Sequence, residues 1–477
     1  MPSRWMELWD TPSSKPALID GVSGRPVPAG ELEFATRAVA SALLGMELRP
    51  GDRVLLWGAP SLRTAVISVG VLRAGLVLVP VNPALTEGEL THVINETSPA
   101  ACASDTREAM RLMLELSPSM LSLETTEGVK RPGFHGLDAA KATDPALILF
   151  TSGTTGAPKG AVHSHSSLLA NTDALATAWQ WTPSDRLVHA LPMFHAHGLC
   201  VGLLACLGVG ASVVILPRFG PAEVFEAAER YNASMFFGVP TMYHRILGQH
   251  MADRLGPLRL AVSGSAPLAA ALHQAIEAAG GGRVLERYGT TESLMNLSNP
   301  YAGERRPGSV GLPLPGVEVR LAGDAQADEG ELLVRGPSIF SSYWGRPKAR
   351  AAVVKDGWYH TGDIASMDAD GYVRVLGRTT ELVISGGFNV YPAEVETVLA
   401  ELGGVAEVAV AGTPSDEWGE VVTAYVVPSG DTAGLVDSIN QLAAERLAPY
   451  KRPRIVHLVE SLPRNAMGKV VRRELGS

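Results

Sequence analysis

Cysteines, uninterrupted apolar segments and blocks of basic residues are all scarce in this chain of 477 residues. The three cysteines, Cys102, Cys200 and Cys206, have the spacing of neither a metal site nor a disulfide framework. We therefore expect a reducing compartment, the cytoplasm. The net charge is −9 and no long run of Lys or Arg occurs, so nucleic acid and anionic membranes are not expected partners.

The chain also lacks the usual signs of membrane insertion or export. No apolar stretch of the signal-peptide type follows Met1. The uncharged segment 198–216 is nominally long enough to cross a bilayer. It contains Gly208 and Gly210, which break a helix, so we expect a buried helix followed by a strand at 211–216.

Strand-like and helix-like segments alternate through the first part of the chain. Apolar runs at 54–57, 76–81 and 101–103 are separated by helical patterns at 61–74 and 87–96. The same alternation returns after residue 230 and continues to about residue 280. Such alternation is typical of βαβ units and a largely parallel sheet. The length exceeds what one core supports, so more than one domain is expected.

The pattern changes beyond Gly308. Segments 317–321 and 330–335 alternate apolar and polar residues, as half-exposed antiparallel strands do, and predict a small β-barrel-like subdomain. A compact α+β pattern begins after Thr380. The sequence therefore predicts an α/β protein with a large domain at 1–378, a hinge at 379–380 and a small mobile domain at 381–477.

A loop rich in Thr, Ser and Gly follows the apolar run 147–150. It reads TSGTTGAPKG and ends in a single lysine, Lys159. Such loops offer backbone N–H groups and hydroxyls to phosphate oxygens, and the lysine adds a positive charge. The glycine spacing is not that of a Walker A loop, and a flexible surface turn is the alternative. The predicted phosphate ligands are Thr151, Ser152, Gly153, Thr154, Thr155, Gly156 and Lys159.

Further motifs follow in a fixed order. They are MFHAHG at 193–198, YGTTE at 288–292, YHTGD at 359–363, GR at 377–378, SGGFN at 385–389 and PRNAMGK at 463–469. Together with the phosphate loop they resemble the adenylate-forming enzymes, which include acyl-CoA synthetases, firefly-type luciferases and peptide-synthetase adenylation domains. The resemblance implies an ATP-dependent, AMP-forming reaction with Mg²⁺, and it extends almost to the end of the chain.

The resemblance assigns the remaining nucleotide contacts. Glu292 is expected to hold Mg²⁺, since that ion favours one or two carboxylates beside phosphate oxygens and water. Thr291 is expected to donate to the α-phosphate, and Asp363 with Arg378 to hold the ribose hydroxyls. A helix-start role for Glu292 and a turn role for Asp363 are the structural alternatives. The other expected ATP or AMP contacts are Ser265, Ala266, Glu286, Tyr288, Gly289 and Thr290.

The resemblance also implies that the small domain rotates between two half-reactions. Lys469 matches the lysine that contacts the carboxylate and the α-phosphate during adenylation, so a lysine acetyltransferase and deacetylase are expected partners. His195 matches the residue that gates the thiol tunnel. Thr380 stands at the hinge, where the family usually has Asp or Lys. The expected CoA contacts are Ser385, Gly386, Gly387 and Phe388.

Two arginines indicate the acid. Arg287 precedes Tyr288 in the YGTTE motif, and Arg245 lies on the helix after Val239 and Pro240. A buried unpaired guanidinium is costly in an apolar pocket, whereas a second substrate carboxylate would pair with it. This segment resembles malonyl-CoA and methylmalonyl-CoA synthetases, in which His197 and Met295 would also line the acyl pocket. Two surface or salt-bridged arginines are the alternative.

The sequence therefore predicts an acyl-CoA ligase for malonate or methylmalonate. Three alternatives remain open: a CoA ligase for another short or medium-chain acid, an adenylation enzyme that loads a separate carrier protein, and a catalytically silent AMP-binding sensor. The intact Lys159, Glu292, Asp363 and Lys469 argue against the sensor.

Overall fold

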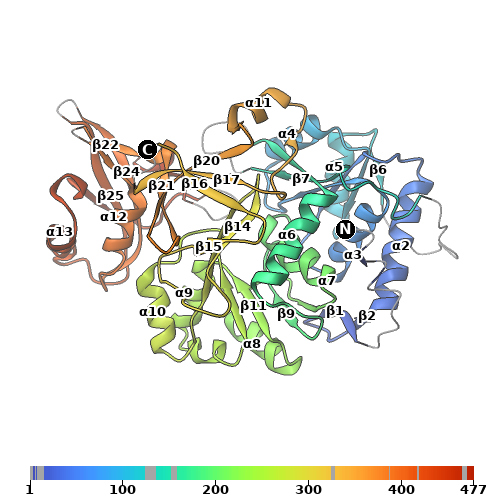
Figure 1. The fold of residues 1–477 in the computed structure, drawn as a ribbon, viewed down its shortest axis with the longest axis horizontal. Coiled ribbons are helices and arrows are strands. Elements are labelled where there is room, and N and C mark those ends of the chain that lie inside the picture. The colour runs from blue at the N-terminus through green and yellow to red at the C-terminus, as the bar shows by residue number, and fades with distance from the viewer. Residues whose placement is uncertain are drawn as a thin grey trace. The chain divides into compact units, whose positions relative to one another are not determined.

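The computed structural model describes residues 4–5, 7, 15–123, 136–151, 158–323, 328–385, 387–415, 418–464 and 470–476. These residues form four β-sheets with helices between their strands (Figure 1). The predicted α/β class, with a barrel-like subdomain and a C-terminal α+β domain, is confirmed. The predicted residues 152–156, Gly386 and Lys469 lie outside the described residues.

The largest sheet has nine strands in the order β15-β14-β13-β12-β11-β9-β10-β1-β2. Neighbours from β13 to β1 run parallel, and β14, β15 and β2 add antiparallel edges. The bounds are β1 Pro16–Asp20, β2 Pro26–Pro28, β9 Arg186–His189, β10 Ser212–Ile215, β11 Met235–Gly238, β12 Leu260–Ser263, β13 Leu285–Thr290, β14 Leu294–Ser298 and β15 Leu312–Pro313.

Apolar helices cover this sheet. Phe225 of α8 and Tyr243 of α9 are fully buried with Phe236 of β11, which joins helices and sheet in one core. Proline stands in the first turn of α8 and of α9, where its fixed φ suits a helix start. The bounds are α8 Pro221–Arg230, α9 Pro240–Gly248 and α10 Ala270–Ala278, with a 3₁₀ turn, η2, at Ala252–Leu255.

A second sheet has seven strands in the order β18-β8-β7-β4-β3-β5-β6. The strands β7, β4, β3, β5 and β6 are parallel, whereas β8 and β18 are antiparallel to their neighbours. The bounds are β3 Arg53–Trp57, β4 Val77–Val81, β5 Ala101–Ser104, β6 Leu121–Ser122, β7 Pro145–Phe150, β8 Gly160–Ser164 and β18 Ser342–Tyr343.

The helices α3, α4, α5 and α6 around the second sheet begin with side-chain caps, whereas α2 does not. Ser61 accepts from the N–H of Thr64 at the start of α3, and Thr86 forms a capping box with Glu89 on α4. Their ends agree with the predicted helices within a few residues. The bounds are α2 Ala29–Gly45, α3 Leu62–Arg73, α4 Glu87–Thr97, α5 Arg107–Leu116 and α6 His165–Ala178.

The predicted helix-then-strand arrangement of 198–216 is confirmed, with one difference. His197–Ala205 is a π-helix, η1, followed by the short α7, Cys206–Gly208, and by β10. All of η1 is buried, and Gly198 and Gly202 allow it to approach Pro192 and His189 closely. The wider π-turn is a local departure that often marks functional sites, and no apolar periodicity predicts it. None of the described helices is long and apolar enough to cross a membrane.

The third sheet forms the barrel-like subdomain. Its order is β16-β17-β20-β19, and β21 also pairs with β20. Exposure alternates along β16, as predicted for 317–321, whereas three consecutive residues of β17, 332–334, are buried. The bounds are β16 Glu318–Leu321, β17 Glu329–Arg335, β19 Val354–Lys355, β20 Trp358–Met367 and β21 Val373–Arg378, and α11 is Pro347–Val353.

The C-terminal part has its own sheet and core. The order is β23-β22-β25-β24, with β26 parallel to β25, and α12 and α13 cover it through Val395, Leu399 and Ile439. The bounds are β22 Val383–Ser385, β23 Phe388–Val390, α12 Pro392–Leu399, β24 Val405–Ser415, β25 Gly419–Pro428, α13 Leu435–Arg446 and β26 Ile455–Leu458, with 3₁₀ turns η3 Thr379–Glu381, η4 Pro449–Lys451 and η5 Arg472–Glu474.

The chain divides into two compact units. The first contains Met1–Thr151, Pro158–Val319 and Val334–Tyr359, and the second contains Arg320–Leu333 and His360–Ser477. Thr379 and Thr380 therefore lie in the second unit, within η3. A hinge at these residues stays a prediction.

Candidate active site

The two strands beside the predicted phosphate loop form a hairpin. Phe150 of β7 pairs with Gly160 of β8, the N–H of Thr151 donates to the carbonyl of Lys159 (2.9 Å), and the N–H of Lys159 lies 3.3 Å from the Thr151 hydroxyl. A Cβ at Gly160 would lie 2.6 Å from Ile148, so only glycine fits this position without a shift. The ends of the loop are thus fixed by the sheet.

Lys159 lies near a tyrosine that the sequence did not indicate. Its Nζ lies 5.4 Å from the centroid of the Tyr343 ring, a cation–π distance. The Tyr343 hydroxyl donates to Glu292 Oε1 (2.8 Å). Tyr343 therefore contacts both the predicted phosphate lysine and the predicted metal carboxylate. Its two-residue strand has no periodic pattern, and no sequence signal that we recognise identifies it.

The turn that carries Thr291 and Glu292 is held by its backbone. It joins β13 to β14, and the Thr290 hydroxyl accepts from the N–H of Ser293 (3.2 Å). His163 Nε2–H donates to the carbonyl of Thr291 (2.7 Å), and the N–H of Phe340 donates to the carbonyl of Glu292 (2.7 Å). Burial lowers the pKa of His163 to about 4, so the ring is neutral and its one N–H serves this bond.

The predicted adenine-flanking turn is attached to the same strand. Ser265 has a left-handed φ of 72° and is exposed, as is Ala266. Glu286, buried on β13, accepts from the N–H of Leu268 (2.8 Å) and so ties the end of this turn to the sheet. Tyr288, two residues further along β13, is half-buried. The structure thus brings the 264–268 segment beside β13, and gives Glu286 a positioning contact.

A buried cation lies beside this turn. Arg287 is 3% exposed, and its Nη2 is 3.5 Å from the Ser265 hydroxyl. Among the described residues its Nε has no hydrogen-bond partner. Gly264 leaves the space that the guanidinium occupies, because a Cβ there would lie 2.4 Å from Arg287 Cζ. Burial lowers the pKa of Arg287 to about 9, so it remains a cation at neutral pH.

His197 also contacts Ser265. Its Nδ1 lies 3.4 Å from the Ser265 hydroxyl, and its ring stacks on Phe237 with centroids 6.3 Å apart. Burial, with Arg287 as a second cause, holds the pKa of His197 well below its usual range. Its Nε2 has no hydrogen-bond partner among the described residues. His197 is therefore a neutral group beside the Arg287 cation.

The other predicted acyl and tunnel residues lie in different surroundings. Arg245 is exposed on α9, and its Cζ lies 5.1 Å from the centroid of Phe219. Met295 is buried on β14, opposite Gly289, and its carbonyl accepts from Asn171. His195 is half-buried, with its ring 4.5 Å from that of Phe194. The described contacts bring Arg287 and His197 together, and they do not join Arg245 to either.

The predicted ribose contacts form an ion pair in the second unit. Asp363 and Arg378 face each other across β20 and β21, and Arg378 Nε donates to Asp363 Oδ1 (3.0 Å). Asp363 is 4% exposed. The neighbouring Thr379 hydroxyl donates to the carbonyl of Gly362 (3.0 Å). The arginine fixes the position of the carboxylate.

The predicted CoA segment combines a buried serine with exposed neighbours. Ser385 is 1% exposed, Gly387 has a φ of 84°, and Phe388 is 55% exposed. The Phe388 ring stacks on Tyr450 with centroids 4.7 Å apart. Thr380 is exposed in η3.

Arg472, three residues beyond Lys469 in sequence, is bound to this same unit. It donates to Glu381 (2.5 Å), to Glu396 (2.8 Å) and to the carbonyl of Val410 (3.1 Å). An antiparallel bridge between Arg464 and Val470 flanks residues 465–469. The sequence reasoning did not include Arg472.

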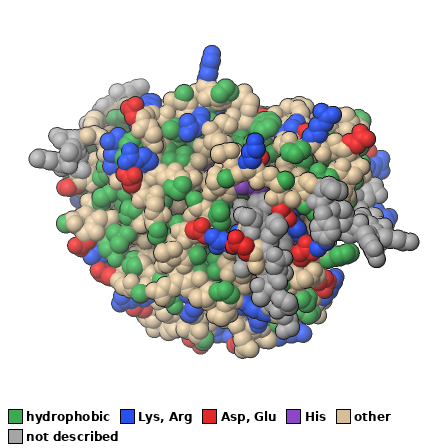
Figure 2. Space-filling model, turned by 45° about the vertical axis from the view of Figure 1, so that its right-hand side comes forward, with side chains coloured by type: hydrophobic (Ala, Val, Ile, Leu, Met, Phe, Trp, Pro, Cys, Tyr) green, Lys and Arg blue, Asp and Glu red, His purple; other side chains and the backbone are tan. Residues whose placement is uncertain are grey.

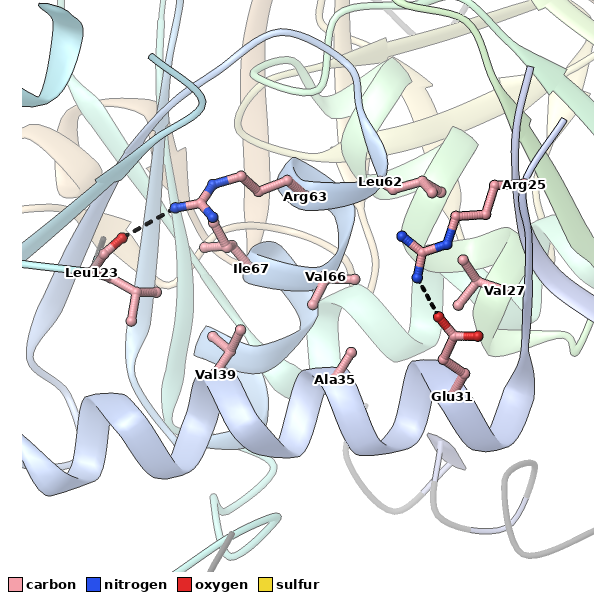
Figure 3. Close-up of a pocket in the computed structure, with 10 residues that line it drawn as sticks. All are labelled: Arg25, Val27, Glu31, Ala35, Val39, Leu62, Arg63, Val66, Ile67 and Leu123. Atoms are coloured by element: carbon pink, nitrogen blue, oxygen red, sulfur yellow. Dashed lines mark hydrogen bonds and ion pairs between the residues drawn. The ribbon is translucent and has the colours of Figure 1, made fainter. Parts of the chain in front are cut away.

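The clearest hollow on the first unit lies away from the motifs. It has a volume of about 250 Å³, and Figure 3 shows that its floor consists of aliphatic side chains from α2 and α3. Both of its arginines already have partners: Arg25 binds Glu31 (2.5 Å), and Arg63 donates to the carbonyl of Leu123 (3.3 Å). Since no free polar group points into it, we do not assign substrate binding to this hollow.

The surface charge agrees with a small-molecule enzyme. On the face shown in Figure 2, Lys and Arg side chains are interspersed with Asp and Glu, without a broad basic field among the described residues. No group of three or more potential metal-ligating side chains is found in the described part of the chain.

Comparison with protein families decides the class. Residues 8–344 match the AMP-binding enzyme model, and residues 394–469 match the AMP-binding enzyme C-terminal domain. The chain belongs to the AMP-binding enzyme family. It is an acid–thiol ligase of the AMP-forming acyl-CoA synthetase type, which confirms the predicted reaction class.

Relatives of this AMP-binding enzyme differ in their acids. A malonate–CoA ligase from Arabidopsis thaliana is 36% identical, over 89% of this chain and 78% of the relative. A long-chain-fatty-acid–CoA ligase from Salmonella typhimurium is 33% identical, over 97% of this chain and 91% of the relative. Identity alone therefore does not choose the acid.

Solved structures are similar over almost the whole chain. The ATP-bound MatB from Rhodopseudomonas palustris has a TM-score of 0.90 and 36% identity, covering 99% of this chain and 98% of that one. A malonyl-CoA ligase complex with methylmalonyl-CoA and AMP has a TM-score of 0.71 and 40% identity, covering 95% and 98%.

Proposed function

We propose that this ligase converts malonate or methylmalonate to its CoA thioester, with ATP as the activating substrate. The observation that carries the choice of acid is the buried Arg287, whose Nε has no partner among the described residues. A fatty-acid pocket would leave this cation unpaired at a cost of several kcal/mol, roughly. A distal carboxylate pairs with it, and neutral His197 adds no competing charge.

The reaction has two steps, adenylation and thioester formation. A carboxylate oxygen attacks the α-phosphorus of ATP, the bond to pyrophosphate breaks, and an acyl-adenylate forms. The CoA sulfur then attacks the acyl carbon, its proton leaves, and AMP departs. In the first step Lys159 and the loop 151–156 hold the phosphates, Thr291 donates to the α-phosphate, and Asp363 with Arg378 holds the ribose. The similar MatB structure was solved with ATP bound, which supports ATP as the activating nucleotide.

The residues around Glu292 fit a Mg²⁺ ion that arrives with ATP. Glu292 is half-buried, and one of its oxygens accepts from Tyr343, which leaves the other for a metal. A single carboxylate is a suitable protein ligand for Mg²⁺, since this ion keeps waters and phosphate oxygens in its shell. The ion would neutralise charge on the triphosphate, while Glu292 fixes its position.

The second step requires a different set of contacts to the acyl carbon. We assign to Lys469 the contact with the carboxylate and the α-phosphate during adenylation, and to His195 the gating of the thiol tunnel. The segment 385–388 would line the path of the pantetheine arm after the small domain has rotated about Thr380. The exposed Phe388 and the left-handed Gly387 suit a surface that a flexible thiol passes. The malonyl-CoA ligase complex with methylmalonyl-CoA supports CoA as the acceptor. Acetylation of Lys469 would remove the charge that adenylation needs.

A panel of acids tests the proposal. Pyrophosphate release and thioester formation would be measured with malonate, methylmalonate, propionate, butyrate and a long-chain fatty acid, with and without CoA. We expect the highest kcat/KM for malonate or methylmalonate, and a CoA thioester identified by mass. A preference for monocarboxylates would overturn the dicarboxylate assignment and leave the ligase class intact. Transfer only to a carrier protein would overturn CoA as the acceptor.

A further inference from the structure

Tyr343 occupies a position that the ligase motifs do not explain. It lies on β18, the edge strand next to β8, where it pairs with Ala161. The N–H of the next residue, Trp344, donates to the carbonyl of Gly160 (2.8 Å), directly after the phosphate loop. The Tyr343 backbone is therefore fixed to the strand that directly follows Lys159.

The hydroxyl of Tyr343 restrains the Glu292 carboxylate. It donates to Glu292 Oε1 (2.8 Å), while the N–H of Phe340 donates to the Glu292 carbonyl (2.7 Å). Burial and the adjacent carboxylate raise the pKa of Tyr343, so the phenol keeps its proton and acts only as a donor. One carboxylate oxygen is thus held, and the rotation of the carboxylate is restricted.

The ring of Tyr343 makes a second, separable contact. Lys159 Nζ lies 5.4 Å from the ring centroid, and the tyrosine ring also packs against Phe340, with centroids 4.7 Å apart. The ring therefore positions the exposed ammonium by a cation–π contact. One side chain joins the cation that binds phosphate to the anion that binds the metal.

We propose that Tyr343 is a positioning residue that sets Glu292 and Lys159 at the separation that metal-bound ATP requires. The hydroxyl acts through Glu292 on the metal, and the ring acts through Lys159 on the phosphates. This inference rests on the proposed use of Mg²⁺ with ATP, and it does not depend on the acid. Groups that orient a metal ligand typically change metal affinity by about 10–100-fold when they are removed.

Two substitutions separate the two contacts. Tyr343→Phe removes the hydroxyl and keeps the ring, whereas Tyr343→Leu removes both. ATP affinity would be measured by calorimetry without acid or CoA, once with MgCl₂ and once with EDTA. For Tyr343→Phe we expect the gain in affinity from Mg²⁺ to fall about 10-fold or more, with affinity in EDTA nearly unchanged. For Tyr343→Leu we expect weaker binding in EDTA as well.

A matched control and a double variant test whether the effect passes through Glu292. Tyr359→Phe deletes a hydroxyl from another ring that packs on Phe340, with centroids 6.0 Å apart, and should leave the Mg²⁺ gain as in wild type. In a Glu292→Gln background, Tyr343→Phe should cause no further loss, because the partner is already altered. Thermal unfolding of each variant would show that it folds.

Several results would overturn the proposal. A wild-type Mg²⁺ gain in Tyr343→Phe would exclude the hydroxyl's role, and so would an undiminished effect in the Glu292→Gln background. An equal loss of the Mg²⁺ gain in the Tyr359→Phe control would show that Tyr343 acts only through packing. A wild-type enzyme that binds ATP equally well in MgCl₂ and EDTA would overturn the proposed metal as well. A failure of the malonate assignment alone would leave every one of these measurements unchanged.

Discussion

At the residue scale, the two arginines that suggested a dicarboxylate are not equivalent. Arg287 is buried beside Ser265 and His197, whereas Arg245 is exposed over Phe219. A buried cation costs desolvation energy in the free enzyme, and a substrate carboxylate offsets that cost on binding. An exposed arginine has no such cost. We therefore propose that Arg287 contributes the larger share of the specificity.

We therefore predict different effects for Arg287→Met and Arg245→Met. Loss of Arg287 should lower kcat/KM for malonate, which corresponds to an activation free energy higher by about 2–5 kcal/mol. KM for ATP should stay nearly unchanged. Relative use of butyrate should rise, since an apolar pocket accepts a methyl end. Arg245→Met should have the smaller effect. Steady-state kinetics of both variants on both acids would decide, and equal losses would contradict the distinction.

Lys469 gives a second prediction at this scale. Lys469→Ala should remove about 2.7–4 kcal/mol of stabilisation from adenylation, and spare thioester formation from a supplied acyl-adenylate. The reason is that the ammonium neutralises the substrate carboxylate and the α-phosphate only while the carboxylate attacks the phosphorus. Pyrophosphate release and thioester formation would be followed separately. Adenylation at the wild-type rate would show that the tail has another role.

At the element scale, the last turn η5 is attached to its unit by a half-buried ion-pair network. Arg472 contacts Glu381 and Glu396, and burial raises the pKa of Glu396. Removing Arg472 leaves two half-buried carboxylates without their cation, which should cost less than the roughly 3–5 kcal/mol typical of a fully buried pair. The side chain of the neighbouring Arg473 is 68% exposed, and its Nε lies 3.8 Å from Glu474 Oε1.

Arg472→Met should accordingly destabilise the second unit, and Arg473→Met should not. We expect the unfolding transition of the C-terminal part, followed by calorimetry, to move to lower temperature only in the first variant. Since the two arginines are adjacent, they form a matched pair. Equal shifts would indicate that the network contributes little stability.

Elements also show where sequence reasoning succeeds. The alternation of strands and helices follows from periodicity. The resemblance placed Asp363 and Arg378 in one site, and they form an ion pair, whereas the sequence left open whether Arg287 is buried or on the surface. Tyr343 could not be found in this way, because β18 has two residues and pairs with a strand far away in sequence. The π-turn of η1 and the His163–Thr291 bond likewise depend on tertiary contacts, which local patterns do not encode.

At the scale of the whole molecule, buried histidines set a limit on acid stability. Burial lowers the pKa of His163, His165 and His189 to about 4, from 6.5 in the unfolded chain. Below pH 6.5 the unfolded state binds more protons than the folded state, so stability falls as pH drops towards 4. For each histidine, every pKa unit between the folded and the unfolded state changes the free energy of unfolding by about 1.4 kcal/mol.

His165→Leu tests this expectation. Both ring nitrogens of His165 lack a hydrogen-bond partner among the described residues, so an apolar side chain of similar size should be tolerated. We expect stability at pH 7.5 to be retained, and the fall in Tm between pH 6.5 and 4.5 to be shallower than in wild type. An unchanged slope would show that His165 does not titrate as its burial implies.

The pairing of β18 with β8 has a consequence for biosynthesis. The two strands are 179 residues apart at the Ser341–Val162 contact. At roughly 5–20 residues per second, a ribosome needs about 10–40 seconds to make the intervening chain. During this interval the nascent phosphate hairpin lacks the strand that flanks it and the tyrosine that positions its lysine. Nucleotide is therefore expected to assist folding only after Tyr343 has emerged, late in translation.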